Sequence, residues 1–235
     1  MLKKLIALAV VFNILSCAEL HQVVNQLPQD TGVIGNDQIA SALRQALDLG
    51  IEKQVTKLTQ KDGFYKNNLV KITLPDELLK VDKTLRDIGL GNLADEGLKV
   101  LNRAAEDAVK EATPIFINAV KEIGFTDARN ILMGADNAAT QYLTTKTQSE
   151  LYNKFSPVIK SSFNNVGADK IWTNLISKYN SIPFTNKVNP DLTDYVTQEA
   201  LNGVYTMIAV EEKEIRTRIS SRTTTLLQEV FALQD

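Results

Sequence analysis

The sequence predicts an all-α protein with a single-domain body of roughly ten helices over residues 37–235. Apolar residues recur at steps of three and four along most of this range, which is the period of an α-helix with one buried face. The pattern contains no paired strands of alternating polarity. No linker-like stretch divides the range, and about 200 residues are enough to bury a sizeable core.

Four segments account for the first half of this body. A helix is predicted over 37–58, an extended connector over 64–74, and a second helix that begins at Pro75. A third helix, over about 93–112, carries mostly alanine on its apolar face. Because small side chains let neighbouring helices approach closely, we expect this third helix at the centre of the bundle.

Prolines and caps set the expected boundaries of the second half. Thr113 and Pro114 indicate the cap and first residue of a new helix, or a kink in a continuous one. Asp136 is the expected N-cap of a later helix, and Pro157 predicts a kink or break within it. Residues 191–219 are predicted to form the longest helix, and a last short helix follows.

Cysteine and histidine each occur once, as Cys17 and His21. The body downstream therefore has no disulfide, no Cys- or His-ligated zinc, no cysteine nucleophile and no histidine-based triad. Phosphate-binding loops and the common hydrolase signatures are absent as well, so no metal and no cofactor is predicted. A formal net charge of −2 argues against a nucleic-acid partner.

The N-terminus has the pattern of an export signal. Residues 1–16 combine Lys3 and Lys4 with an apolar run that is too short to span a bilayer as a permanent helix. Cys17 follows in the sequence LSCA, which resembles the bacterial lipobox, where the cysteine is lipidated and becomes the first residue after cleavage. A plain signal peptide with an incidental cysteine is the alternative. Residues 17–36 are then predicted to be a flexible tether.

The lipobox also predicts a location. Two or more acyl chains on one cysteine are sufficient for stable membrane anchoring. Ala18 follows the cysteine, and by resemblance to enterobacterial sorting this residue favours the outer membrane over the inner one. We therefore expect a lipid-anchored protein on the periplasmic face of the outer membrane.

An anomaly in the long C-terminal helix supplies the first candidate site. Glu211 occupies a position on the apolar stripe of this helix, and an acid there must be paired, protonated or near the exit from the core. Arg216 and Arg222 are candidate partners for Glu211 or Glu212, and Tyr195 brings a hydroxyl to the same helix. The cluster is either a buried ion pair that fixes helix packing or a polar spot in an apolar pocket.

Two smaller clusters are further candidates. Asp136, Gln141 and Tyr142 lie near the start of one predicted helix, where the glutamine and tyrosine can hydrogen-bond to neighbouring helix ends. Arg103 lies beside the small-residue face of another helix and can reach acids on a neighbour. For both clusters the alternative is an ordinary packing or surface role.

These clusters belong to longer stretches of sequence, namely NRAAE (102–106), DARNILMGADNAATQY (127–142), KYN (178–180), PDLTDYVTQEALNG (190–203), IAVEEKEIR (208–216) and RTT (222–224). Together the stretches resemble the bacterial family called domain of unknown function 4197. The resemblance extends over residues 36–233, and the order and spacing of the motifs make it specific. It implies a helical, exported and often lipid-anchored protein, and it implies no activity, substrate or catalytic residue.

The predicted function is that of a non-catalytic envelope protein, which binds a protein partner or holds an apolar ligand between its helices. One alternative is an enzyme without Cys or His that uses Glu211, Tyr142 or Tyr195 in a cleft, and another is a structural envelope factor. A pocket at Glu211 and Gln141 would favour a ligand or an enzyme, whereas a solid core with an exposed apolar patch would favour a protein partner.

Overall fold

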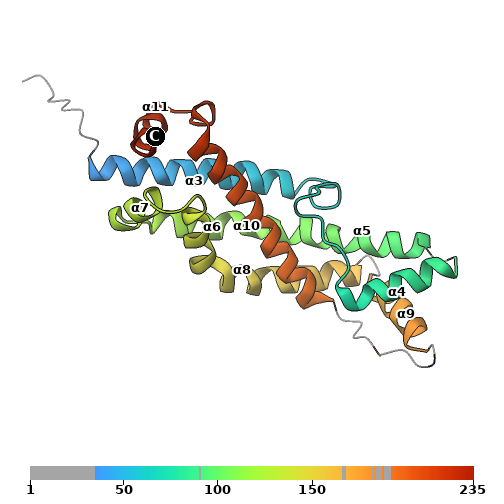
Figure 1. Cartoon of the computed structure of the whole chain (residues 1–235). Helices are drawn as coiled ribbons and strands as arrows, with labels where there is room; N and C mark the ends of the chain where they lie inside the picture. The colour runs from blue at the N-terminus through green and yellow to red at the C-terminus, as the bar shows by residue number, and fades with distance from the viewer. Residues whose placement is uncertain (1–34, 90, 166–167, 182, 184–186, 188–191) are drawn as a thin grey trace, which may run out of the picture. The chain divides into compact units, whose positions relative to one another are not determined.

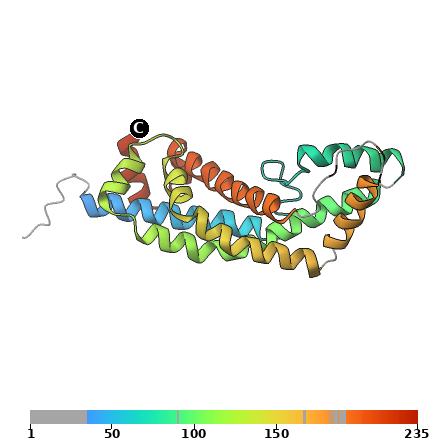
Figure 2. The ribbon, with the colours of Figure 1, turned by 90° about the horizontal axis from the view of Figure 1, so that it is seen from below.

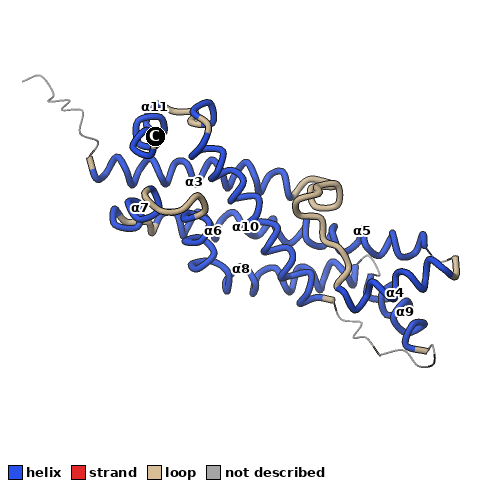
Figure 3. Tube along the Cα trace, viewed as in Figure 1, coloured by secondary structure: helices blue, strands red, loops and turns tan. Residues whose placement is uncertain are grey.

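The structure is a computed structural model of the chain, and it describes residues 35–89, 91–165, 168–181, 183, 187 and 192–235. The described residues form nine α-helices, slightly fewer than the ten expected, and no strand (Figures 1 and 3), which confirms the all-α prediction. The predicted signal segment, Cys17 and almost all of the predicted tether lie outside the described residues. In chain order the helices are α3 (Asn36–Leu58), α4 (Asp76–Asp87), α5 (Gly91–Ala108), α6 (Ala112–Lys121), α7 (Phe125–Leu132), α8 (Ala138–Asn165), α9 (Ala168–Asn180), α10 (Thr193–Thr217) and α11 (Thr225–Phe231), with short 3-10 helices η1 (Val109–Glu111), η2 (Ile219–Ser221) and η3 (Ala232–Gln234).

Residues Asn36–Asp235 form one compact unit. Helix α10 packs against α8, α3 and α5, and α3 also packs against α6, α7 and α11. Helices α4 and α9 pack against α5 and against each other, and Figures 1 and 2 show them at the opposite end of the body from α7 and α11. The long C-terminal helix α10 therefore connects α3 with α8 and α5 in one core.

The predicted small-residue helix is central, as expected. Along α5, the side chains of Ala94, Leu101, Ala104, Ala105 and Ala108 are all at most 2% exposed, and this helix contacts α8, α10, α4 and α9. The side chains of alanine are short, so the backbones of these neighbours can approach closely.

The boundary at Pro114 differs from the first alternative that the sequence offered. Helix α5 passes through the 3-10 turn η1 into α6, which begins at Ala112, and the residue before it keeps helical backbone angles. Thr113 is therefore not an N-cap, and Pro114 lies within the first turn of α6. Proline is tolerated there because the first-turn N–H groups have no intrahelical acceptor.

Of the kink or break expected at Pro157, the break is wrong, and α8 rather than α10 is the longest helix described. Helix α8 runs for 28 residues with Pro157 in its interior, against 25 residues for α10. Pro157 is exposed, so the carbonyl of Asn153, which loses its helical N–H donor there, is on the solvent side. On the opposite face Leu151, Phe155 and Ile159 are fully buried, and this packing keeps the helix continuous.

The connector between α3 and α4 packs into the body. Phe64 and Ile72 are at most 1% exposed. The Asn102 side chain of α5 accepts a hydrogen bond from the N–H of Ile72 (2.8 Å) and donates one to its carbonyl (2.9 Å). One buried amide thus satisfies the backbone of Ile72, which lies outside any helix. The expected extended conformation over 64–74 is wrong for residues 64–66 and 68–70, which form hydrogen-bonded turns.

Candidate functional site

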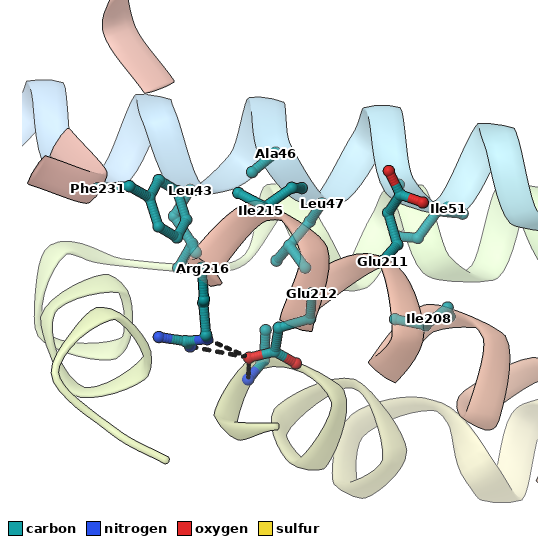
Figure 4. A pocket seen from close by; sticks show the side chains of 12 residues that line it. Leu43, Ala46, Leu47, Ile51, Ile208, Glu211, Glu212, Ile215, Arg216 and Phe231 are labelled. Carbon is teal, nitrogen blue, oxygen red and sulfur yellow. Dashed lines mark hydrogen bonds and ion pairs between the residues drawn. The ribbon is translucent and has the colours of Figure 1, made fainter. Parts of the chain in front are cut away.

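Glu212 and Arg216, one turn apart on α10, form a buried ion pair (Figure 4). The guanidinium Nη2 and Nε atoms of Arg216 donate to Oε1 of Glu212 at 2.8 and 3.0 Å. Their side chains are only 5% and 6% exposed. This pairing is one of those that the sequence suggested. The geometry supports the interpretation of a buried ion pair that fixes the packing of the helices.

The carboxylate of Glu212 also binds the start of α8. The backbone N–H groups of Ala139 and Thr140 donate to its two oxygens at 2.9 Å each, and the Thr140 hydroxyl adds a bond of 2.8 Å. The first N–H groups of a helix lack internal acceptors and carry a partial positive charge, so a carboxylate is well placed there. Asp136, the expected cap, is exposed, and Glu212 takes this role from another helix.

Arg216 binds the C-terminal end of α7. Its Nη2 and Nη1 atoms donate to the last carbonyls of α7, those of Ile131 (2.8 Å) and Leu132 (3.1 Å). A cation at a helix C-terminus and an anion at a helix N-terminus both match the helix dipoles. The pair therefore fastens the turn between α7 and α8 onto α10.

Glu211 is oriented toward α3 instead. Its two carboxylate oxygens accept hydrogen bonds from Nζ of Lys53 and from Nε2 of Gln54, both at 2.6 Å. Glu211 is 8% exposed, and a Cβ at Gly50 of α3 would lie 3.2 Å from its Cγ, so the helices are in close contact here. Of the two acids offered as partners for Arg216 and Arg222, Glu212 is therefore the one that pairs with an arginine, and Glu211 pairs with Lys53.

Arg222 closes the C-terminal end of α10. It is 2% exposed and donates to the carbonyls of Ile215 (3.1 Å) and Arg216 (3.0 Å), which have no helical donors left. Its other contact is bidentate, with the Asp235 carboxylate at 2.7 and 2.8 Å. These hydrogen bonds lower the pKa of Asp235 below its usual value.

Arg103 belongs to a separate cluster near the connector. It forms ion pairs with Asp62 and Glu106, and Glu106 accepts the backbone N–H of Phe64 at 3.2 Å. Asp62 has a positive φ of 72°, a conformation that few residues other than glycine adopt. The cluster holds the turn after α3.

The remaining candidates lie apart from Glu211. Gln141 is exposed and donates to Asn137 in the turn before α8 (3.2 Å), and burial raises the pKa of the half-buried Tyr142. The Tyr195 hydroxyl donates to the carbonyl of Thr73 at 2.8 Å. Tyr195 and Glu211 are separated by 16 residues of α10, which is about 24 Å along the helix axis. None of the grooves and cavities described here is lined by Gln141, Tyr142 or Tyr195.

The interior beside Glu211 and Glu212 is almost filled. The cavity drawn in Figure 4 has a volume of about 20 Å³ and is lined mainly by apolar residues of α3 and α10, with Phe231 of α11. This volume is enough for about one water molecule. The described residues contain no group of three acidic, Cys or His residues placed to hold a metal ion. Within the same part of the chain, no helix has the length and apolar character needed to cross a membrane.

A larger concavity lies on the surface on the other side of Glu211. This α3–α10 groove, of about 620 Å³, is bounded by α3, the end of α10 and the η2–α11 segment. Leu49, Ile215 and Leu227 supply its apolar surface. Its other lining residues are Glu52, Lys53, Thr56, Glu211, Ser220, Ser221 and Thr223.

Sequence reasoning missed the α3 partners of Glu211, although one signal was present. Gln54 lies three residues after Ile51 and four before Leu58, on the apolar stripe of the predicted first helix, and it is 2% exposed. A polar residue on each of two apolar stripes suggests that the two residues meet. Lys53 gives no comparable signal, because it lies off the stripe among ordinary surface residues.

Replacing Glu211 with alanine is expected to lower the free energy of unfolding by about 1–3 kcal/mol. The substitution leaves Nε2 of the buried Gln54 without its acceptor, whereas Lys53, with a side chain 53% exposed, remains solvated. Denaturant unfolding measures the change. Glu214→Ala on the same helix is the control, because Glu214 pairs with the exposed Arg218, and its loss is expected to cost less than about 1 kcal/mol. Equal effects of the two substitutions would contradict the burial of Glu211.

The fold and the contacts of α10 define an all-helical protein whose C-terminal long helix is tied to its neighbours by buried carboxylates and guanidinium groups. The family model described as "Protein of unknown function (DUF4197)" matches residues 33–232, and the chain belongs to this family. The resemblance of the sequence motifs is thereby confirmed. No curated protein and no solved structure matches the chain.

Proposed function

We propose that the protein is a non-catalytic, lipid-anchored binding protein of the bacterial cell envelope, which holds a segment of a protein partner in the α3–α10 groove. The groove itself carries this proposal, since it combines exposed apolar surface with hydrogen-bonding groups at its edge. The cavity of about 20 Å³ between α3 and α10 is too small for an apolar ligand. A protein partner is therefore favoured over a small apolar ligand.

The chemistry of the groove indicates what the partner segment presents. Leu49 is 43% exposed on the α3 wall of the groove, which favours an apolar side chain opposite it. Lys53 is already paired with Glu211, whereas Glu52 makes no ion pair with the described residues. We infer that the partner places an apolar anchor on Leu49 and a basic residue beside Glu52.

Site-specific photocrosslinking in living cells tests this function. A photoreactive amino acid at Leu49 is expected to give one discrete crosslinked product with a protein, and Glu52→Lys in the same chain is expected to weaken it strongly. The control position is Leu79 on α4, which is 51% exposed and lies outside the groove. Equal products from both positions, or none from Leu49, would contradict the proposal.

The envelope location is proposed from the sequence LSCA at Cys17 and from the charged, then apolar, segment before it. Cys17→Ser removes the only thiol that lipidation can use, so the protein is expected to move from the membrane fraction to the soluble fraction after cell lysis. Fractionation followed by immunoblotting measures the change. Membrane association that persists in this variant would contradict lipid anchoring.

A further inference from the structure

A second surface concavity lies between α8 and α10, toward the N-terminal end of α10. This α8–α10 groove, of about 290 Å³, is lined by Gln148, Ser149, Tyr152, Asn153, Gln198 and Leu201. Its volume lies just below the range for pockets that bind drug-sized molecules, which extends from about 300 to about 1,000 Å³. It is distinct from the α3–α10 groove, because the two share no lining residue.

The lining of the α8–α10 groove carries no formal charge, although 23% of the chain is charged. Three side-chain amides, those of Gln148, Asn153 and Gln198, make no hydrogen bond with the described residues. Each amide offers two N–H donors and an acceptor oxygen. The groove therefore presents a dense set of neutral hydrogen-bonding groups.

Two further features add acceptors and a free hydroxyl at the same place. Pro157 has no N–H, so the backbone carbonyl of Asn153 lacks its usual helical donor and faces the solvent side. Thr144, Thr145 and Thr147 on α8 donate their hydroxyls to the carbonyl four residues earlier, but Ser149 makes no such bond.

Tyr152 gives the groove a fixed aromatic surface. Its hydroxyl donates to Oδ1 of Asp194 on α10 at 2.6 Å, so the ring is held between the two helices. This hydrogen bond also raises the pKa of Tyr152. Leu201 also lines the groove but is only 3% exposed, so the Tyr152 ring supplies most of the apolar surface. A ring held in place before binding loses little conformational entropy when a ligand packs on it.

We propose that the α8–α10 groove binds a neutral saccharide. A sugar ring has an apolar C–H face, which packs on an aromatic ring, and an edge of hydroxyl groups, which exchange hydrogen bonds with amides. Both halves of this chemistry are present at Tyr152 and at the three amides. An ionic ligand would find no opposite charge among the lining residues, and a purely apolar ligand would leave the amides unpaired. The ligand is accordingly a glycan unit without formal charge.

Titration calorimetry with two soluble probes tests this inference. The full chain is purified in a detergent without a sugar headgroup and is titrated with a β-1,4-linked tetramer of N-acetylglucosamine or with maltotetraose. Saturable binding of at least one probe is expected. Binding of the acetylated probe alone would indicate an amino-sugar glycan, and binding of maltotetraose would indicate recognition of hydroxyl groups. Absence of binding by both probes would overturn the inference.

Variants place the binding in the groove. Tyr152→Ala is expected to weaken binding at least about tenfold, since it removes the packing surface. Gln198→Ala is expected to weaken binding severalfold. Because Gln198 is exposed, this variant is expected to fold, and it carries the test if Tyr152→Ala unfolds. Tyr65→Ala is the matched control, because Tyr65 is partly buried outside the groove. Binding that all three variants retain in full would overturn the assignment to this groove.

Discussion

Glu212→Ala is expected to lower the free energy of unfolding by about 3–5 kcal/mol, which makes it one of the two most damaging substitutions considered for this protein. The change leaves the guanidinium of Arg216 buried without its counter-charge. It also removes the acceptor for the first N–H groups of α8 at Ala139 and Thr140. Both losses occur in the interior, where water cannot replace the missing contacts. Denaturant unfolding monitored by circular dichroism measures the effect.

A double substitution separates the ion pair from the capping of the two helices. A buried ion pair whose two groups contact only each other can often be replaced by apolar residues with little loss of stability. Here Glu212→Leu combined with Arg216→Met is expected to remain strongly destabilised, because the α8 N–H groups and the carbonyls of Ile131 and Leu132 lose their partners. A double variant as stable as the unmodified chain would contradict the capping role.

The periodic pattern of apolar residues was sufficient to predict the fold, and two of the errors in it have local causes. Pro157 was expected to kink or break α8, and the break does not occur because the exposed position lets solvent satisfy the freed carbonyl while Phe155 and Ile159 stay packed. Thr113 and Pro114 were expected either to begin a new capped helix or to kink a continuous one, and the capped start is wrong because the chain passes into α6 through a 3-10 turn. Both errors come from judging a residue by its type without knowing which side of the helix it occupies.

The candidate site was predictable only as far as contacts within one helix allow. Glu212 and Arg216 are four residues apart on α10, and this spacing places them side by side on any α-helix. The Lys53 and Gln54 contacts of Glu211 connect segments more than 150 residues apart. Two adjacent acids thus face different helices, and only the packing of α10 between α3 and α8 decides which acid meets which partner.

The second large effect is expected for Gly203→Val, in the interior of α10. A Cβ built there would lie 2.6 Å from Cε1 of Phe64 and 3.3 Å from Cβ of Val70. Replacing a helical glycine with alanine normally stabilises a protein by about 1 kcal/mol. At this position the overlap with a fully buried ring outweighs that gain, since forcing an extra methyl group into a packed core costs about 1–3 kcal/mol. Gly203→Val, which adds a larger branched side chain, is expected to be more damaging than Gly203→Ala.

A combination with Phe64→Leu distinguishes steric overlap from any other effect of Gly203→Ala. The smaller leucine removes the ring atoms that the new Cβ would meet, so the double variant is expected to be more stable than the sum of the two single changes predicts. Asn202→Ala on the exposed side of the same helix is the control, and its effect is expected to stay within about 0.5 kcal/mol. Strictly additive effects of Gly203→Ala and Phe64→Leu would show that the two residues do not contact each other. In that event the connector would not pack on α10 as the structure places it, because Phe64 is the residue whose ring touches α10 at Gly203.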